Sequence, residues 1–533
     1  MTNPFPTPDT RASGATRGTG EPAADADGLL FDGPEWDFPT VRRTFDAIEK
    51  VGTEDLGLSL YPTRLEVINA EQMLDAYASV GMPTMYRHWA FGKRFVQHET
   101  MYRRGFSGLA LEIVINADPS LCYIMEENTM TMQATVMAHA AVGHNHFFKN
   151  NRLFQEWTDP EAILDYLSFA KSYIAACEEK YGIEAVERTI DAAHALQGQG
   201  VDRSTGRGRR MDARAEQERV SEMNRRNLEG EEDLWLRTVP VKRDLVAGDP
   251  EELERQAEAR AMGLPEENLL YFLEKNAPRL REWQRELLRI VRNIATYFEP
   301  QKQTKMMNEG CACWCHYTIM TMLHERGLIS DSAFMEFLHL HANVVTQPAY
   351  DDRRYSGINP YALGFAMTRD IERICTEPTE EDRAWFPGIA GNDKPVATLC
   401  EAWANYRDES FIRQYLSPRV MRDFAMFRLD DDTEDPDIVV EAIHDERGYR
   451  RVRQGLANLY DPANTEPRIE VVGADIHGDR TLTLQHTVRD GRLLDALETR
   501  RTLRHLSWLW GYHVRLTEVD AETGHIYAEH ENL

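Results

Sequence analysis

Three histidines stand within eight residues of the sequence, in the string HAAVGHNH at 139–146. The flanking residues are apolar, so we expect buried imidazoles. Because a buried imidazole needs partners for both ring nitrogens, such a cluster indicates either a hydrogen-bonded network or a metal ion. On a regular helix His139 and His146 lie about 20° apart, but His144 lies about 140° from His139. For His139 and His144 to face one ion, the helix must be distorted, and Gly143 is the residue that permits this.

A second polar group interrupts an apolar helix far along the chain, in the string NEGCACWCH at 308–316. Glu309 and His316 are seven residues apart, about 20° from eclipsed on a helix, so both side chains can face one cavity. Burying a carboxylate and an imidazole in apolar surroundings is costly unless they are paired or bind a metal. Gly310 permits close approach of another backbone or a ligand.

Together the two strings offer His139, His144, Glu309 and His316 as a mixed nitrogen and oxygen ligand set. This set suits a divalent ion, Zn²⁺ or Fe²⁺, with room for an open water position. The alternative is a buried hydrogen-bonded network of the same side chains that only fixes helix packing. Spacing alone leaves both interpretations open.

The cysteines in the second string alternate as Cys311, Cys313 and Cys315. On a helix Cys311 and Cys315 share a face and Cys313 points away. Because structural zinc sites favour a C-x-x-C spacing, we interpret these thiols as small, soft residues of a tight core. A redox role is the alternative.

The remaining candidates are weaker. Glu126 and Glu127 are consecutive carboxylates beside an apolar run, and Glu127 is a candidate general base or partner of a ligating histidine. A charge at a helix start is the alternative. His339 and His341 cannot share a helical face, so we expect structural roles. The polar loop at 347–361 is either a rim for an anionic ligand or an ordinary long loop.

Composition limits the class of protein. With 533 residues the chain is long enough for two or three domains, and 42% hydrophobic and 28% charged residues are typical of globular proteins. A net charge of −27 disfavours nucleic acid as a partner. We expect no transmembrane segment, because no run approaches the roughly 18 to 20 apolar residues required. Seven cysteines do not indicate a disulfide framework. With no signal-peptide core at the N-terminus, we expect a cytoplasmic protein.

The pattern predicts a mainly α multi-helix domain with a smaller C-terminal α+β domain. Residues 1–30 read as a disordered leader, 31–430 as the helical core and 431–533 as the α+β domain, while 200–262 form a charged linker or insertion. The long apolar run at 109–148 is interpreted as buried helices. Strands are expected at 468–476, 481–488, 513–519 and 525–530, with a helix at 492–510.

Several helix ends carry clear signals. Asp159 and Pro160 predict a helix start, and Gly182 predicts its end. A helix around 304–326 should end at Gly327 and follow a break at Pro300. Further helices are expected after Asn359 and after Ser417, each of which precedes a proline. Four apolar residues predict one buried stripe of a helix: Leu287, Ile290, Val291 and Ile294.

The sequence resembles the SpoVR family, named for stage V sporulation protein R. The resemblance rests on strings such as MEENTMTMQATVMAHAAVGHNHFFKNN, ENLLYFLEKNAP, QKQTKMMNEG, SGINPYALGFAM, PTEEDRAWFP, DESFIRQYLSPRVMRDF and GDRTLTL. It runs from Trp36 to the C-terminus and is loose only over 200–262. The positions of His139, His144, Glu309 and His316 match the family pattern. Where that pattern usually reads NEGWATFWH, this chain has three cysteines, and His146 replaces a smaller polar residue.

The resemblance implies a link to spore cortex formation, in a family that also occurs in bacteria that never sporulate. Its genes commonly accompany those of a PrkA-type serine kinase and a YeaH-type protein, and it carries no assigned reaction. We therefore expect a metal-dependent hydrolase in cell-wall or spore-cortex formation or in stress physiology. Glu127 or Glu309 would handle protons, and a peptidoglycan precursor or a peptide would be the substrate. The alternative is a non-catalytic regulatory partner of the kinase and the YeaH-type protein.

Overall fold

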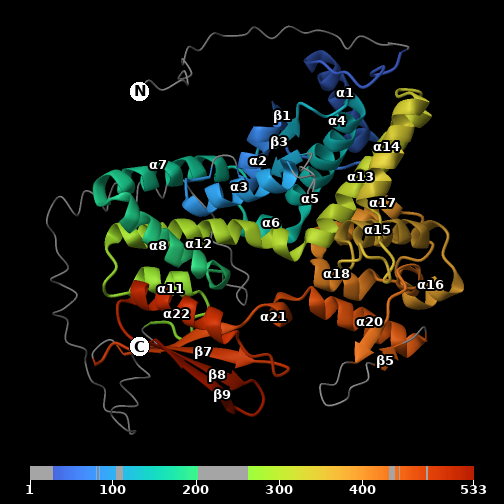
Figure 1. Ribbon diagram of the computed structural model, residues 1–533. Helices are drawn as coiled ribbons and strands as arrows, with labels where there is room; N and C mark the ends of the chain where they lie inside the picture. The colour runs from blue at the N-terminus through green and yellow to red at the C-terminus, as the bar shows by residue number, and fades with distance from the viewer. Residues whose placement is uncertain are drawn as a thin grey trace, which may run out of the picture.

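The computed structural model describes residues 28–532 except 80, 83–84, 104–111, 202–261, 431–438, 443–444 and 476–477. The leader predicted at 1–30 and the charged segment predicted at 200–262 therefore lie almost wholly outside the described residues. The fold is mainly α-helical with a smaller α+β part at the C-terminus, as predicted from the sequence (Figure 1).

The helices of the first half are α1 (Phe38–Lys50), η1 (Val51–Asp55), α2 (Ala70–Ala78), α3 (Trp89–Arg103), α4 (Met130–Val136), η2 (Met137–His144), α5 (Asn145–Asn150), α6 (Arg152–Trp157), α7 (Ile163–Tyr181), α8 (Ile183–Ala195) and η3 (Gln197–Gln199). The second half contains α11 (Leu269–Asn276), α12 (Glu282–Gln303), α13 (Lys305–Glu325), α14 (Asp331–Val344), α15 (Pro360–Thr376), α16 (Glu380–Trp385), α17 (Pro395–Asn405), α18 (Asp408–Tyr415), α19 (Pro418–Asp423), α20 (Glu446–Leu459), α21 (Pro462–Thr465) and α22 (Ala496–Trp510). The strands are β1 (Thr63–Ile68), β2 (Glu112–Ile115), β3 (Ser120–Met125), β4 (Arg428–Asp430), β5 (Val439–Ala442), β6 (Ile469–Ala474), β7 (Leu482–Val488), β8 (Val514–Asp520) and β9 (Ile526–Glu531).

A small sheet lies beside the helices of the first half and corrects one prediction. The apolar run at 109–148 was expected to be helical, but it contains β2 and β3, and helix begins only at Met130. In the sheet order β1-β3-β2, β3 pairs parallel with β1 and antiparallel with β2. The β-branched run at 113–115 favours strand, and the turn at Asp118 and Pro119 leaves segments too short for helices.

One group of buried apolar residues, the first core, includes residues of α1, η2, α13, α15 and α17. Within it, α13 approaches two other helices through glycines. A Cβ on Gly310 would lie 2.5 Å from the carbonyl carbon of Gly364 in α15. A Cβ on Gly143 would lie 2.5 Å from the Cα of Ala312. The backbone approach predicted at Gly310 is therefore confirmed, and the approaching chain is α15. These contacts hold η2, α13 and α15 at fixed positions relative to one another.

A buried carboxylate fixes the start of α13. The two oxygens of Asp408 accept hydrogen bonds from the backbone nitrogens of Met306 and Met307, at 2.8 and 2.9 Å. These are orphan donors of a helix N-terminus, where a negative charge is also favoured by the helix dipole. Asp408 thus anchors the helix that carries Glu309 and His316.

The C-terminal sheet has the order β6-β7-β8-β9, and α22 follows β7, as the sequence predicts. The sheet is not an isolated unit. Its buried residues and those of α22 form one core with residues of α8, α11 and α12, and these elements lie close together in Figure 1. The helix α20, which precedes the sheet, packs instead on α18, and its Tyr449 and Val452 belong to the first core.

Most predicted helix ends are confirmed. Helix α15 begins at Pro360 behind an Asn359 cap and α19 at Pro418 behind a Ser417 cap, and Gly327 follows α13 with a φ of +68°. Two differ: α7 begins at Ile163, beyond Pro160, and α12 runs through Pro300. Among the described helices, none is both long and apolar enough to cross a membrane.

The helix crossing at Gly364 should be intolerant of any side chain. In Gly364→Ala the new Cβ would lie 2.2 Å from the carbonyl oxygen of Met306, so the backbones of α13 and α15 must separate. We expect a loss of about 3 kcal/mol or more in the free energy of unfolding, measured by urea denaturation. The control is Gly455→Ala in α20, whose Cβ meets nothing within 4 Å, and which should gain about 0.5–1 kcal/mol. Equal effects at both positions would contradict this account of the crossing.

Candidate metal centre

The segment around the first histidines is a π-helix. In a π-helix a backbone N–H bonds to the carbonyl five residues earlier, so residues five apart in η2 (Met137–His144) fall on successive turns. His139 and His144 are therefore on the same side of the helix, with ring centroids 4.7 Å apart. The distortion predicted from their spacing is present. It extends over the whole segment, and the part that Gly143 plays is the close contact with α13.

Glu309 of α13 faces both imidazoles. Its Oε2 lies 3.6 Å from Nε2 of His139 and 3.6 Å from Nε2 of His144. Both distances exceed the 2.7–3.2 Å range of N–H···O hydrogen bonds. The Oε2 atom is buried and has no hydrogen-bond partner. A buried carboxylate oxygen in this state is costly unless a cation lies beside it.

The other ring nitrogens are occupied. Nδ1 of His144 lies 2.9 Å from Oδ1 of Asn308. Because an amide oxygen only accepts, Nδ1 of His144 carries the proton and Nε2 presents a lone pair toward Glu309. Fixing the tautomer through a hydrogen bond at the second nitrogen is typical of histidines that bind metals.

His139 belongs to a chain of three histidines. Its Nδ1 lies 3.0 Å from Nδ1 of His316, and Nε2 of His316 lies 2.7 Å from Nδ1 of His341. If the hydrogen bonds run from His139 through His316 to His341, His139 donates from Nδ1, and its Nε2 presents a lone pair. In the other direction Nε2 would donate to Glu309, but 3.6 Å is too long for that bond. The distances favour the first arrangement.

The result is three potential ligand atoms that face one another: Nε2 of His139, Nε2 of His144 and Oε2 of Glu309. One ligand atom from each of these residues lies within 4.8 Å of the others. Ligands about 2.1 Å from a tetrahedral ion are about 3.4 Å apart, close to the observed 3.6 Å. The donor types and their separation fit a divalent metal ion.

The electrostatics of the cluster also favour a positive charge at this point. Burial lowers the pKa of His144 to about 4, so its imidazole is neutral and able to ligate. Burial opposes the charged form of Glu309, yet the two imidazoles bring the pKa of its carboxyl below the usual value. Burial likewise opposes the charged form of His139, but Cys313, Glu309 and Glu112 raise its pKa well above the usual value. A proton or a metal ion can supply the charge that the cluster favours.

Two further side chains border the centre and were not among the predicted site residues. Oε1 of Glu112, on β2, lies 3.9 Å from Nε2 of His139, and burial raises the pKa of this carboxyl. The Tyr361 side chain interacts with Glu309, which contributes to a raised pKa of its hydroxyl. The side chains of Glu112 and Glu309 are 23% and 14% exposed, so this side of the centre reaches solvent. A single carboxylate in the strand EIVI was the available signal for Glu112. Tyr361, in the first turn of α15, is the last residue of the segment 347–361 that was considered as a ligand rim.

Not every predicted site residue joins the centre. His316 lies on the opposite side of His139, where it forms a separate group with His139 and Cys313. Because Nδ1 of His139 and Nδ1 of His316 are at hydrogen-bond distance, one proton satisfies that contact. Glu127 is exposed, and its carboxylate accepts a hydrogen bond of 3.2 Å from the backbone nitrogen of Ala70 at the start of α2. It makes no described contact with the three potential ligand atoms.

The remaining histidines and cysteines have other surroundings. Nδ1 of His146 lies 3.2 Å from the backbone nitrogen of Ser59, away from Glu309. Cys311 and Cys315 are fully buried in the first core, as predicted for small packing residues. His341, expected to be structural, ends the histidine chain, whereas His339 is exposed.

The comparisons with known proteins agree with the resemblance seen in the sequence. The family model described as SpoVR like protein matches residues 35–465, and the model described as SpoVR-like C-terminal domain matches residues 467–521. The uncharacterized protein YcgB of Escherichia coli (strain K12) is 49% identical over 491 residues, which cover 92% of this chain and 94% of YcgB. No solved structure matches the chain. The match to the family model spans both the π-helix and α13, and the chain belongs to the SpoVR-like family.

Proposed function

We propose that the protein is a metal-dependent hydrolase whose ion is held by His139, His144 and Glu309. The observation that carries this proposal is the convergence of two imidazole nitrogens on one buried carboxylate oxygen, each at 3.6 Å and beyond hydrogen-bond distance. Two histidines and one glutamate are the ligands of a common class of catalytic zinc sites and also suit Fe²⁺. Zn²⁺ and Fe²⁺ are therefore the candidate ions.

A bound ion of this kind would polarise a substrate carbonyl and make water a stronger nucleophile. Glu112 is the group best placed to accept a proton from that water, because its carboxylate borders the centre on the side that reaches solvent. It takes the role first assigned to Glu127. Tyr361 orients the Glu309 carboxylate. Asn308 and His316 hold the two ligating rings in the required tautomers.

The substrate class follows from the family. A link to spore cortex and cell wall favours an amide or peptide, such as a peptidoglycan precursor, as the compound hydrolysed in the cytoplasm. The alternative role is a non-catalytic partner of a PrkA-type serine kinase and a YeaH-type protein. In that case the histidine cluster would only fix helix packing, and a buried carboxylate oxygen without a partner would be a net cost of about 1–3 kcal/mol.

Metal content is the first test. Protein purified without a histidine tag should contain about one zinc or iron ion per chain, measured by ICP-MS, and His144→Ala should lose it. His146→Ala is the matched control, since this buried histidine is two residues away and bonds to Ser59 instead. A metal-free wild-type protein that takes up neither ion would overturn the proposal. Co-purification of such a protein with the kinase would support the partner role.

Substitution of His316 tests whether this residue binds the metal ion or only orients the ring of His139. In His316→Leu the ring of His139 loses its hydrogen-bond partner at Nδ1 but keeps the nitrogen that faces Glu309. We expect metal affinity to fall about 10- to 100-fold, measured by competition with a chelator, with full occupancy restored at excess metal. His144→Ala should not recover under the same conditions. Complete loss of binding in His316→Leu would show instead that His316 ligates the ion.

Substitution of Glu112 tests whether this residue acts in catalysis without binding the metal ion. Glu112→Gln keeps the size of the side chain but removes the proton acceptor, so metal content should remain while turnover falls by about 10²- to 10⁴-fold. The probe is p-nitrophenyl acetate hydrolysis by the metal-loaded protein, compared with chelator-treated protein. Glu127→Gln, which changes an exposed carboxylate, is the control and should retain the metal-dependent rate. Unchanged turnover in Glu112→Gln would remove this residue from the mechanism.

A further inference from the structure

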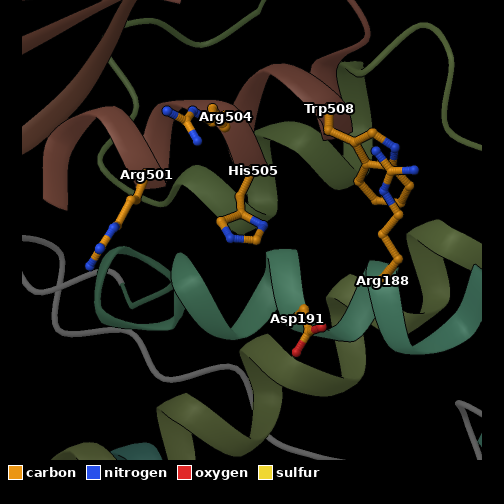
Figure 2. A pocket seen from close by; sticks show the side chains of 6 residues that line it. All are labelled: Arg188, Asp191, Arg501, Arg504, His505 and Trp508. Carbon is orange, nitrogen blue, oxygen red and sulfur yellow. The ribbon is translucent and has the colours of Figure 1, made fainter. Parts of the chain in front are cut away.

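A cavity of about 270 Å³ lies between α8 and α22, apart from the metal centre (Figure 2). Its lining comes from these two helices and consists of Arg188, Asp191, Arg501, Arg504, His505 and Trp508. The cavity therefore lies where the helix that follows β7 meets a helix of the first half of the chain.

The pattern of α22 explains why basic residues line the cavity. Residues 501, 504, 505 and 508 recur at the i, i+3, i+4 and i+7 spacing of one helical face. The opposite face carries buried apolar residues, such as Leu503 and Leu506, which pack into the C-terminal core. The amphipathic helix thus directs a basic stripe toward α8, and Figure 2 shows Arg501 and His505 pointing that way.

The charge of the cavity is opposite to that of the protein. The chain carries a net charge of −27, yet three arginines and a histidine line this cavity against one aspartate. That aspartate is engaged elsewhere. Oδ1 of Asp191 accepts a hydrogen bond of 2.8 Å from Nε1 of Trp89 and lies 3.2 Å from Nε2 of His88. These contacts hold its carboxylate toward Trp89 and His88, and the three arginines of the lining still outnumber it.

The two arginines of α22 in the lining, Arg501 and Arg504, make few interactions with other described residues. Arg501 pairs with Glu498, but both side chains are more than half exposed, at 59% and 65%, so solvent screens the pair. Within the described part of the chain, Arg504 has neither a hydrogen bond nor an ion pair with another residue. These guanidinium groups remain available to an anion.

One arginine is also held in place before any ligand arrives. The guanidinium carbon of Arg188 lies 4.8 Å from the ring centroid of Trp508. A guanidinium stacked on an indole loses less conformational entropy when it binds, and its edge remains free to donate two parallel hydrogen bonds. Paired donors of this geometry match phosphate oxygens.

We propose that this cavity binds the phosphate group of a small, soluble phosphorylated ligand. A volume of about 270 Å³ is below the roughly 300–1,000 Å³ typical of drug-sized ligands, so it suits a phosphate with a small attached group. Nucleic acid and anionic membranes are disfavoured, because a chain with a net charge of −27 repels extended polyanions. Since α8 and α22 both line the cavity, the bound ligand contacts both helices.

Isothermal titration of the full-length protein with inorganic phosphate and with pyrophosphate tests the proposal. Wild-type protein should bind at least one of these probes, and the bound probe should raise the midpoint of thermal unfolding. The double variant Arg501→Ala with Arg504→Ala should weaken binding by about 10-fold or more and lose the thermal shift. Arg447→Ala, an exposed arginine on α20, is the control and should bind as wild type does.

Three results would overturn the proposal. The first is the absence of binding of either probe by wild-type protein. The second is equal binding by the double variant, which would place the anion elsewhere. The third is preferential binding to vesicles that contain anionic lipid, lost in the double variant, which would assign the arginines to a membrane surface. Metal content should be unaffected in every variant, so this test stands apart from that of the hydrolase.

Discussion

The arrangement at the centre depends on one constraint: two imidazole nitrogens and a carboxylate oxygen are held face to face beyond hydrogen-bond distance. Their separations of 3.6 Å are too long for hydrogen bonds and suit ligands around a cation. Asn308 and His316 occupy the second nitrogens of the two rings and so turn the free lone pairs inward.

The helices around the centre are built to hold that geometry. The π-helical turn brings His139 and His144 to one side, Gly143 and Gly310 allow neighbouring backbones to approach α13, and Asp408 anchors the start of that helix. Helix α12 leads into α13, and α8 packs on α12, so the basic cavity at α22 borders the same helical system. A phosphate bound at α8 and a metal ion bound at α13 would each contact a helix that adjoins α12.

Much of the centre was predictable because its residue types are unusual for their surroundings. Buried histidines and a glutamate within apolar strings point to chemistry. Regular helical spacing grouped His139 with His146, and the pairing of His139 with His144 required the distortion that the π-helix supplies. The contacts between the two strings were harder to predict. The placement of His316 behind His139 depends on how η2 and α13 cross, which spacing within one string does not determine. Glu112 was missed because the apolar run around it was interpreted as helix, whereas in β2 its side chain lies 3.9 Å from Nε2 of His139. The basic face of α22 was visible as arginines near residue 500, but its opposing residues are more than 300 positions away.

Anomalous diffraction from crystals of the protein grown with zinc or iron tests the central claim most directly. A peak at the metal absorption edge, bounded by Nε2 of His139, Nε2 of His144 and the carboxylate of Glu309, is the result expected from the geometry. A peak between His139, Cys313 and His316 would assign the ion to the other side of the ring. If no peak is present and Glu309 is hydrogen-bonded to a protonated His139, the cluster is a polar network without a metal.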